Sequence, residues 1–195
     1  MKNFTITLTG EAPILMHNAQ LSDKFNPITK AMSAINAKRT KKTDDDEWEM
    51  RRLEFMGGLY HDADLGPYIP AENLEACLAK AAGLTRNGQD VKRGVRITTA
   101  QAPLVYDGPR DIDGLWNDGD TSGHVHFASV KVGQARIIRT RPIFRQWAVE
   151  FDGIIDPNIL DPESLDQFIG KAGSMIGLGD WRPRFGTFTH ELVVE

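Results

Sequence analysis

Basic side chains fall in a stretch of the sequence, residues 128–147, that contains no acidic residue: Lys131, Arg136, Arg139, Arg141 and Arg145. If this stretch is extended, Arg139 and Arg141 point to the same side, because side chains alternate along a strand. A row of guanidinium groups fits the phosphate backbone of a nucleic acid, and each contact releases counterions. The stretch therefore predicts a phosphate-binding face, with a solvated surface holding local ion pairs as the alternative.

A glycine-rich segment, residues 173–186, offers a second kind of contact. Glycines allow a phosphate or a neighbouring backbone to come close, and a tryptophan can stack on a base. The segment is neither a Walker loop nor a dinucleotide fingerprint, because no Gly-Lys-Ser/Thr follows and it precedes a predicted strand. We predict nucleic-acid binding, with a turn that only fills the core as the alternative. The residues concerned are Gly177, Gly179 and Gly186, together with Trp181, Arg182 and Arg184.

A short basic segment, residues 38–42, is a third candidate for phosphate binding. It contains Lys38, Arg39, Lys41 and Lys42. An acidic run, residues 44–47, follows at once and would partly cancel this charge. The alternative for this segment is an ordinary solvated loop.

Catalytic and metal-binding patterns are weak in this sequence. His17, after the first predicted strand, is the one histidine placed to act as a general acid or base. His124 and His126 would share one strand face, but no third ligand stands at a matching spacing, so neither a metal nor a cofactor is predicted. No serine has the context of a nucleophile elbow. The chain is therefore expected to bind a ligand rather than to transform one.

The helices that must position these residues follow from apolar periodicity. A proline near the first turn and a stripe at i, i+3, i+4 and i+7 predict a helix over residues 69–83, with Cys77 on its apolar face. Asp161 is the expected N-cap of a second helix that runs to residue 172. A further helix is predicted over residues 47–55, inside a segment, residues 18–66, that otherwise lacks a clean period.

The strands complete the predicted fold. They are expected at residues 4–10, 95–106, 136–140, 146–151 and 185–194, and the third and fourth are expected to flank a hairpin or bent ribbon. Without the extra segments the order is strand, helix, strand, strand, helix, strand. That order predicts an α/β (α+β) protein with a ferredoxin-like or RRM-like βαββαβ core and a large insertion after the first strand.

The composition bounds the class of protein. A chain of 195 residues fits one domain, 1–195, and a net charge of −4 argues against indiscriminate coating of nucleic acid. The single cysteine excludes an internal disulfide and suits a reducing compartment. No apolar run is long enough to cross a bilayer, and the N-terminus alternates like a strand rather than a signal peptide. A cytoplasmic protein without a membrane partner is expected.

Three segments resemble, in order, the repeat-associated mysterious protein (RAMP) superfamily, which includes the backbone subunits of CRISPR effector complexes. Residues 8–16 are similar to the family's opening strand, which ends in a Pro-Leu-like turn. Residues 68–78 resemble its helix start after Ile-Pro, although Glu75 and Ala76 stand where the family has Lys-Gly. Residues 176–188 resemble its C-terminal glycine-rich loop, here interrupted by residues 181–183.

The resemblance implies RNA or single-stranded DNA bound along a groove, with subunits stacked side by side or joined to other effector subunits. It also implies that residues 18–66 form a thumb-like insertion. A divergent single-domain member of this kind fits a phage genome, in which case the host cytoplasm is its location.

We therefore expect a non-catalytic protein that binds single-stranded nucleic acid. One alternative is a protein-interaction or assembly module, viral in origin, that never touches nucleic acid; the sequence pI of about 5.7 favours it. The other alternative is a metal-independent endoribonuclease that uses His17, since some RAMP members process RNA.

Overall fold

The computed structural model describes residues 1–39 and 41–195. The chain divides into two compact units, each built from segments that are distant in sequence. Unit 1 comprises residues 1–15, 64–107 and 144–195, and unit 2 comprises residues 16–63 and 108–143. In the described part of the chain, no helix is both long enough and apolar enough to cross a membrane.

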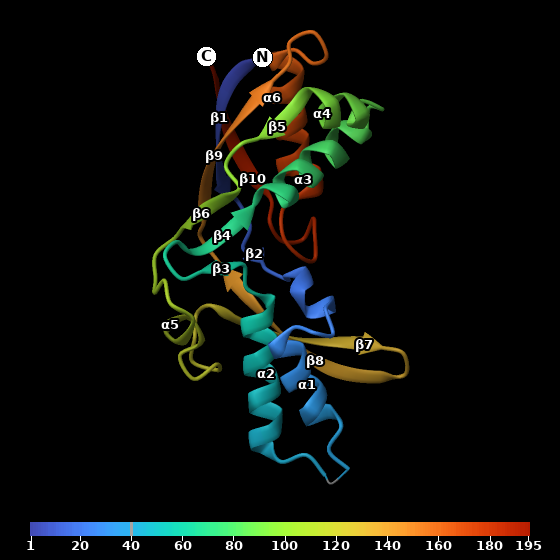
Figure 1. Ribbon diagram of the computed structural model, residues 1–195, viewed down its shortest axis with the longest axis vertical. Coiled ribbons are helices and arrows are strands. Elements are labelled where there is room, and N and C mark those ends of the chain that lie inside the picture. The colour runs from blue at the N-terminus through green and yellow to red at the C-terminus, as the bar shows by residue number, and fades with distance from the viewer. Residues whose placement is uncertain (40) are drawn as a thin grey trace. The chain divides into compact units, whose positions relative to one another are not determined.

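Unit 1 is built on an antiparallel sheet (Figure 1). Its strands run in the order β10-β1-β9-β6-β4, and β5 pairs with β9 beside β6. The bounds are β1 Lys2–Gly10, β4 Gly66–Pro70, β5 Val95–Ile97, β6 Gln101–Val105, β9 Ala148–Ile155 and β10 Phe188–Val194; a two-residue strand, β2 Ile14–Leu15, follows β1. Alternation sends Phe4, Ile6 and Leu8 of β1 into the core and its threonines to the other face.

Helices α3 (Ala71–Gly83) and α6 (Pro162–Lys171) pack against each other and against the apolar face of this sheet (Figure 1). The predicted stripe of α3 is buried, and Asp161 caps α6 by accepting the Ser164 N–H at 2.8 Å. A π-helical turn, η2 (Ala172–Ile176), continues α6, and a short helix, α4 (Gly88–Gly94), follows α3. Taking β5 with β6 as the second strand, the core order is 4-1-3-2, so the predicted ferredoxin-like fold is confirmed.

Unit 2 contains most of the predicted insertion together with a second segment, residues 108–143. Its helical elements are η1 Ala19–Ser22, α1 Pro27–Asn36, α2 Asp44–Gly58 and α5 Ile112–Trp116, and its short strand β3 is His61–Asp62. Asn26 caps α1 by accepting the Ile28 N–H at 2.8 Å, and α1 packs along α2 (Figure 1). The acidic run, residues 44–47, forms the first turn of α2, where negative charge is favoured by the helix dipole. The helix predicted over 47–55 is therefore longer at both ends.

The hairpin of unit 2 corrects one predicted pairing. Strand β8 (Ala135–Phe144) pairs with β7 (Val125–Val132), not with the strand predicted at residues 146–151, of which 148–151 belong to β9 of unit 1. The two strands are joined by Gly133 and Gln134, and Gly133 has a φ of 60°. Glycine supplies this positive φ without a Cβ clash, which makes the short turn possible. The sequence prediction overlooked this turn.

An aromatic cluster in unit 2 is formed by Trp48, Phe55, Trp116 and Phe127, of which Phe55 and Trp116 are buried. The ring centroids of Phe55 and Trp116 are 5.4 Å apart, and those of Trp48 and Phe127 are 6.2 Å apart. The Arg51 guanidinium lies 5.0 Å from the Trp48 ring. These contacts join α2, α5 and β7, so unit 2 has a core of its own.

Candidate nucleic-acid interface

A polar hollow of about 340 Å³ lies in unit 2 and is bordered by η1, α1, α2 and β8. We call it the arginine hollow, because Arg139 and Arg141 of β8 both line it, as expected of residues two apart on a strand. The other polar side chains of its lining include His17, Ser33, Asn36 and Glu54. The structure thus brings two of the predicted phosphate contacts and the predicted acid–base histidine into one concave site.

Glu54 fixes one of these arginines. Its carboxylate is buried, with one oxygen 2.8 Å from Nη1 of Arg139 and the other accepting the Thr140 backbone N–H at 2.8 Å. Charge-assisted hydrogen bonds of this kind are stronger than neutral ones, so the carboxylate ties α2 to β8. The ion pair also offsets part of the charge of Arg139.

Sequence reasoning missed Glu54. It lies between Leu53 and Phe55, both buried, but neighbouring residues on a helix do not face the same way, so this position carries no local signal of a buried carboxylate. The alternative stated for the basic stretch, local ion pairs, thus applies to Arg139. Arg136, by contrast, is exposed, and among the described residues its guanidinium donates to the Ser129 hydroxyl, at 3.5 Å.

The basic segment precedes α2 in unit 2, and all four of its predicted cations are exposed. Lys38 forms an ion pair with Asp46, and Lys42 donates to the Asn36 side chain at 2.7 Å. The hydrogen bond from Lys38, followed by that from the Thr43 backbone, lowers the pKa of Asp46. Arg39 and Lys41 carry no such contact among the described residues; Thr40, between them, lies outside that part.

The glycines of the glycine-rich segment lie against the protein's own backbone in unit 1. Gly177, Gly179 and Gly186 all have positive φ, between 74° and 79°. A Cβ on Gly186 would stand 1.8 Å from the Leu178 carbonyl oxygen, and one on Gly179 would stand 2.2 Å from that of Leu15. The space beside these glycines is therefore occupied by the protein's own backbone, one of the two neighbours predicted for them.

The remaining predicted contacts are exposed side chains of unit 1. Trp181 lies in the glycine-rich loop with its ring centroid 6.2 Å from that of Phe185. Its neighbours Arg182 and Arg184 are exposed, and so is Arg145, between β8 and β9. These positions are accessible to a ligand, and their binding of nucleic acid stays a prediction.

The open face of the unit 1 sheet differs from an RRM platform, which stacks bases on aromatic side chains of its central strands. The central strands β1 and β9 place threonines and acids on this face. Thr5 donates to Asp152 at 2.7 Å and Thr7 to Glu150 at 3.2 Å. Carboxylates repel phosphates, so this face is unsuited to a nucleic-acid strand.

The histidines and acids give no metal centre among residues 1–39 and 41–195, where no group of three or more metal-binding side chains occurs. His126 lies on β7 opposite Arg141. His124 precedes the strand, and its backbone carbonyl accepts the Ile143 N–H at 2.8 Å. β7 begins at Val125, one residue after His124, and the shared strand face of the two histidines stays a prediction.

Comparison with known proteins finds likenesses among solved structures. No protein-family model matches the chain. No curated protein matches it either. Among solved structures, it is similar to a chain in "Cryo-EM structure of the Type III-B Cmr-beta bound to cognate target RNA", with 13% sequence identity and a TM-score of 0.49. The match covers 100% of this chain and 60% of that one, so the chain spans about three fifths of the length of its neighbour.

Proposed function

We propose that this protein binds single-stranded nucleic acid, RNA or DNA, through the arginine hollow and the β7–β8 hairpin of unit 2. The observation that supports it is the convergence of Arg139, Arg141 and His17 on one polar hollow. Guanidinium groups give phosphate oxygens paired, charge-assisted donors. The hydroxyl and amide groups beside them supply further donors. Arg136 is exposed but lies an odd number of residues from both arginines on β8, so it belongs to the opposite face of the strand.

The test is fluorescence anisotropy of labelled single-stranded RNA and DNA over a salt series, with wild type and Arg141→Gln. Each lost phosphate contact should make the slope of log K against log salt shallower by about 0.7, and the affinity should fall by about tenfold at low salt. The matched control is Arg52→Gln, since Arg52 lies in unit 2 but pairs with Asp113 at 3.2 Å and does not line the hollow. Equal binding by both variants would remove the hollow from the proposal.

Charge reversal at Arg139 would not test binding alone. A glutamate at this position would face the buried Glu54 carboxylate, so weaker binding could reflect a disturbed fold. Neutralising Arg141 keeps the Glu54–Arg139 pair intact.

The same hollow supports a second candidate, metal-independent cleavage of RNA, because His17 lines it together with two arginines. A histidine can move the proton of a 2′-hydroxyl while guanidinium groups stabilise the phosphorane. Incubation of RNA with wild type and His17→Ala, in the presence of a chelator, tests this. Cleavage that persists in the variant would exclude His17, and intact RNA with wild type would leave binding as the function.

The RAMP-like segments and the 4-1-3-2 sheet support a further proposal, a RAMP-like subunit that assembles side by side along a strand or with other effector subunits. Light scattering of the protein with oligonucleotides of increasing length tests self-association. A mass that grows stepwise with length is expected. One copy at every length would contradict assembly along the strand, and absence of any binding would favour the protein-interaction module instead.

A further inference from the structure

A second basic surface lies on unit 1, where α3 meets α4. The two helices approach closely, since a Cβ on Gly88 would stand 2.9 Å from the Ala79 carbonyl oxygen. The joint leaves a shallow hollow of about 420 Å³, which we call the α3–α4 hollow. Its floor consists of small residues, and its charged lining is Lys80, Arg86 and Lys92, without an acid among the described lining residues.

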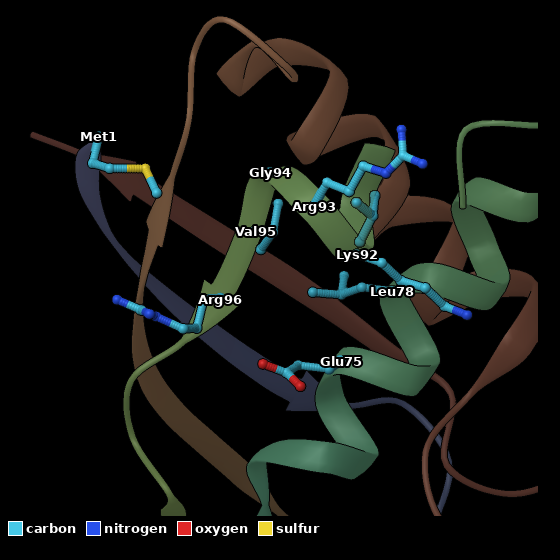
Figure 2. A pocket seen from close by; sticks show the side chains of 9 residues that line it. Met1, Glu75, Leu78, Lys92, Arg93, Gly94, Val95 and Arg96 are labelled. Carbon is cyan, nitrogen blue, oxygen red and sulfur yellow. The ribbon is translucent and has the colours of Figure 1, made fainter. Parts of the chain in front are cut away.

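The cations of this surface continue into an adjoining hollow of about 360 Å³, to which Lys92 also belongs. Figure 2 shows Lys92 and Arg93 at the end of α4 and Arg96 on β5 around it. All of these cations are exposed, and within the described residues none of Lys80, Arg86, Lys92, Arg93 and Arg96 forms an ion pair. Neighbouring cations without acidic partners repel one another, and solvent, salt or a bound anion reduces this repulsion.

Among the described lining residues of this second hollow, one is acidic, and it has a structural role. Glu75 of α3 accepts the backbone N–H of Ile97 with Oε1 at 3.2 Å, which ties the helix to β5. Its charge therefore stands at the sheet end of the hollow, on the side of β5, and leaves the α3–α4 hollow free of carboxylates.

We propose that the α3–α4 hollow is a phosphate-binding site for a nucleic-acid strand, separate from the arginine hollow; the ligand class rests on the proposed function. The cations are distributed over two adjoining hollows instead of converging on one point, as Figure 2 shows for Lys92, Arg93 and Arg96, which suits a linear polyanion. Protein interfaces are anchored mainly by a few large side chains, often Trp or Tyr, seated in well-packed pockets. The described lining of the α3–α4 hollow contains alanine and glycine but no large apolar side chain.

The double variant Lys80→Gln/Lys92→Gln tests the site, with Lys2→Gln/Lys171→Gln as control. The control removes the same charge from unit 1 at positions that line neither hollow. In anisotropy titrations of single-stranded RNA, the test variant should bind about tenfold more weakly at low salt, with a salt slope shallower by about 1.4, while the control stays near wild type. Equal binding by test and control variants overturns the inference.

Two further arms separate this inference from the proposed function. If Arg141→Gln binds normally and the double variant does not, the arginine hollow is excluded and the α3–α4 site is supported. If the double variant binds normally and Arg141→Gln does not, the arginine hollow is supported and the α3–α4 site is excluded. A labelled polyglutamate peptide is titrated in parallel. If wild type prefers the peptide to RNA, and the double variant loses that binding, the surface belongs to an acidic protein partner and the inference is wrong.

Discussion

The Glu54 carboxylate lines the candidate site and also contributes to the stability of unit 2. Glu54→Ala would leave the buried Thr140 N–H without its acceptor and Arg139 without its partner. We expect the free energy of unfolding to fall by about 2–4 kcal/mol, measured by urea denaturation. Glu54→Gln, which keeps an acceptor, should cost less. A loss below about 0.5 kcal/mol in Glu54→Ala, the size of an ordinary surface substitution, would show that the pair contributes little.

Cys77 gives a pH-dependent prediction. Burial raises the pKa of its thiol to about 12, against the opposing charges of Arg182 and Lys80, and Sγ donates to the Gly177 carbonyl at 3.3 Å. The folded state thus holds this proton more tightly than the unfolded state. Its contribution to stability is complete below pH 9, the ordinary pKa of the thiol, and is lost as the pH rises towards 12.

Two measurements check this prediction. At pH 8 the thiol of the native protein should react with a disulfide reagent far more slowly than in guanidinium chloride, because the thiolate is the nucleophile. Between pH 9 and 12 wild type should lose stability relative to Cys77→Ala. Rapid labelling of the native protein at pH 8 would contradict the buried, protonated thiol.

At the scale of the element, the glycine-rich loop depends on close backbone contacts. Gly186→Ala would put a Cβ 1.8 Å from the Leu178 carbonyl oxygen at a φ of 74°. We expect a loss of stability of about 2 kcal/mol or more in thermal unfolding, because strain of 1–3 kcal/mol at such a φ adds to the clash. Gly83→Ala is the control: nothing lies within 4 Å of its Cβ position at the end of α3, and there alanine should be neutral or slightly stabilising. Equal stability of the two variants would mean that the loop can shift without cost.

The elements that the sequence predicted well are those with a strong local pattern. The stripe of α3, the Asp161 cap of α6 and the alternation of β1 are each settled within a few residues, and all are found in the structure. Their order was enough to predict the βαββαβ core. Strand β7 was absent from the predicted strand order, although a strand face was expected at His124 and His126, because the turn at Gly133 that pairs β7 with β8 was overlooked.

The candidate site was only partly predictable, for a different reason. Arg139 and Arg141 could be placed on one strand face from their spacing alone. Glu54 lies 85 positions from Arg139 in the chain, and His17 lies 122 positions from it. No local pattern encodes that residues so distant line the same hollow. The α3–α4 cations were missed because Lys80 and Lys92 look like ordinary solvated charges until the two helices are packed together.

At the scale of the whole molecule, the chain passes between the two units at residues 15–16, 63–64, 107–108 and 143–144. Each unit has its own core: Phe4, Phe151 and their neighbours in unit 1, and the aromatic cluster in unit 2. Regions with separate cores can open with different free energies, which hydrogen exchange resolves. The units should therefore respond separately to a core substitution.

Trp116→Ala is the variant that tests this separation. Trp116 contacts Trp48 and Phe55, so its removal should cost about 3–5 kcal/mol in unit 2. Amides of α2 and of the β7–β8 hairpin should then exchange much faster, whereas amides of β1, which is bonded to β9 on one side and β10 on the other, should stay protected. Phe151→Ala is the reciprocal control and should expose β1 first. If each variant accelerates exchange equally in both units, the two cores unfold as one cooperative structure, and loss of nucleic-acid binding in a unit 2 variant could no longer be assigned to unit 2 alone.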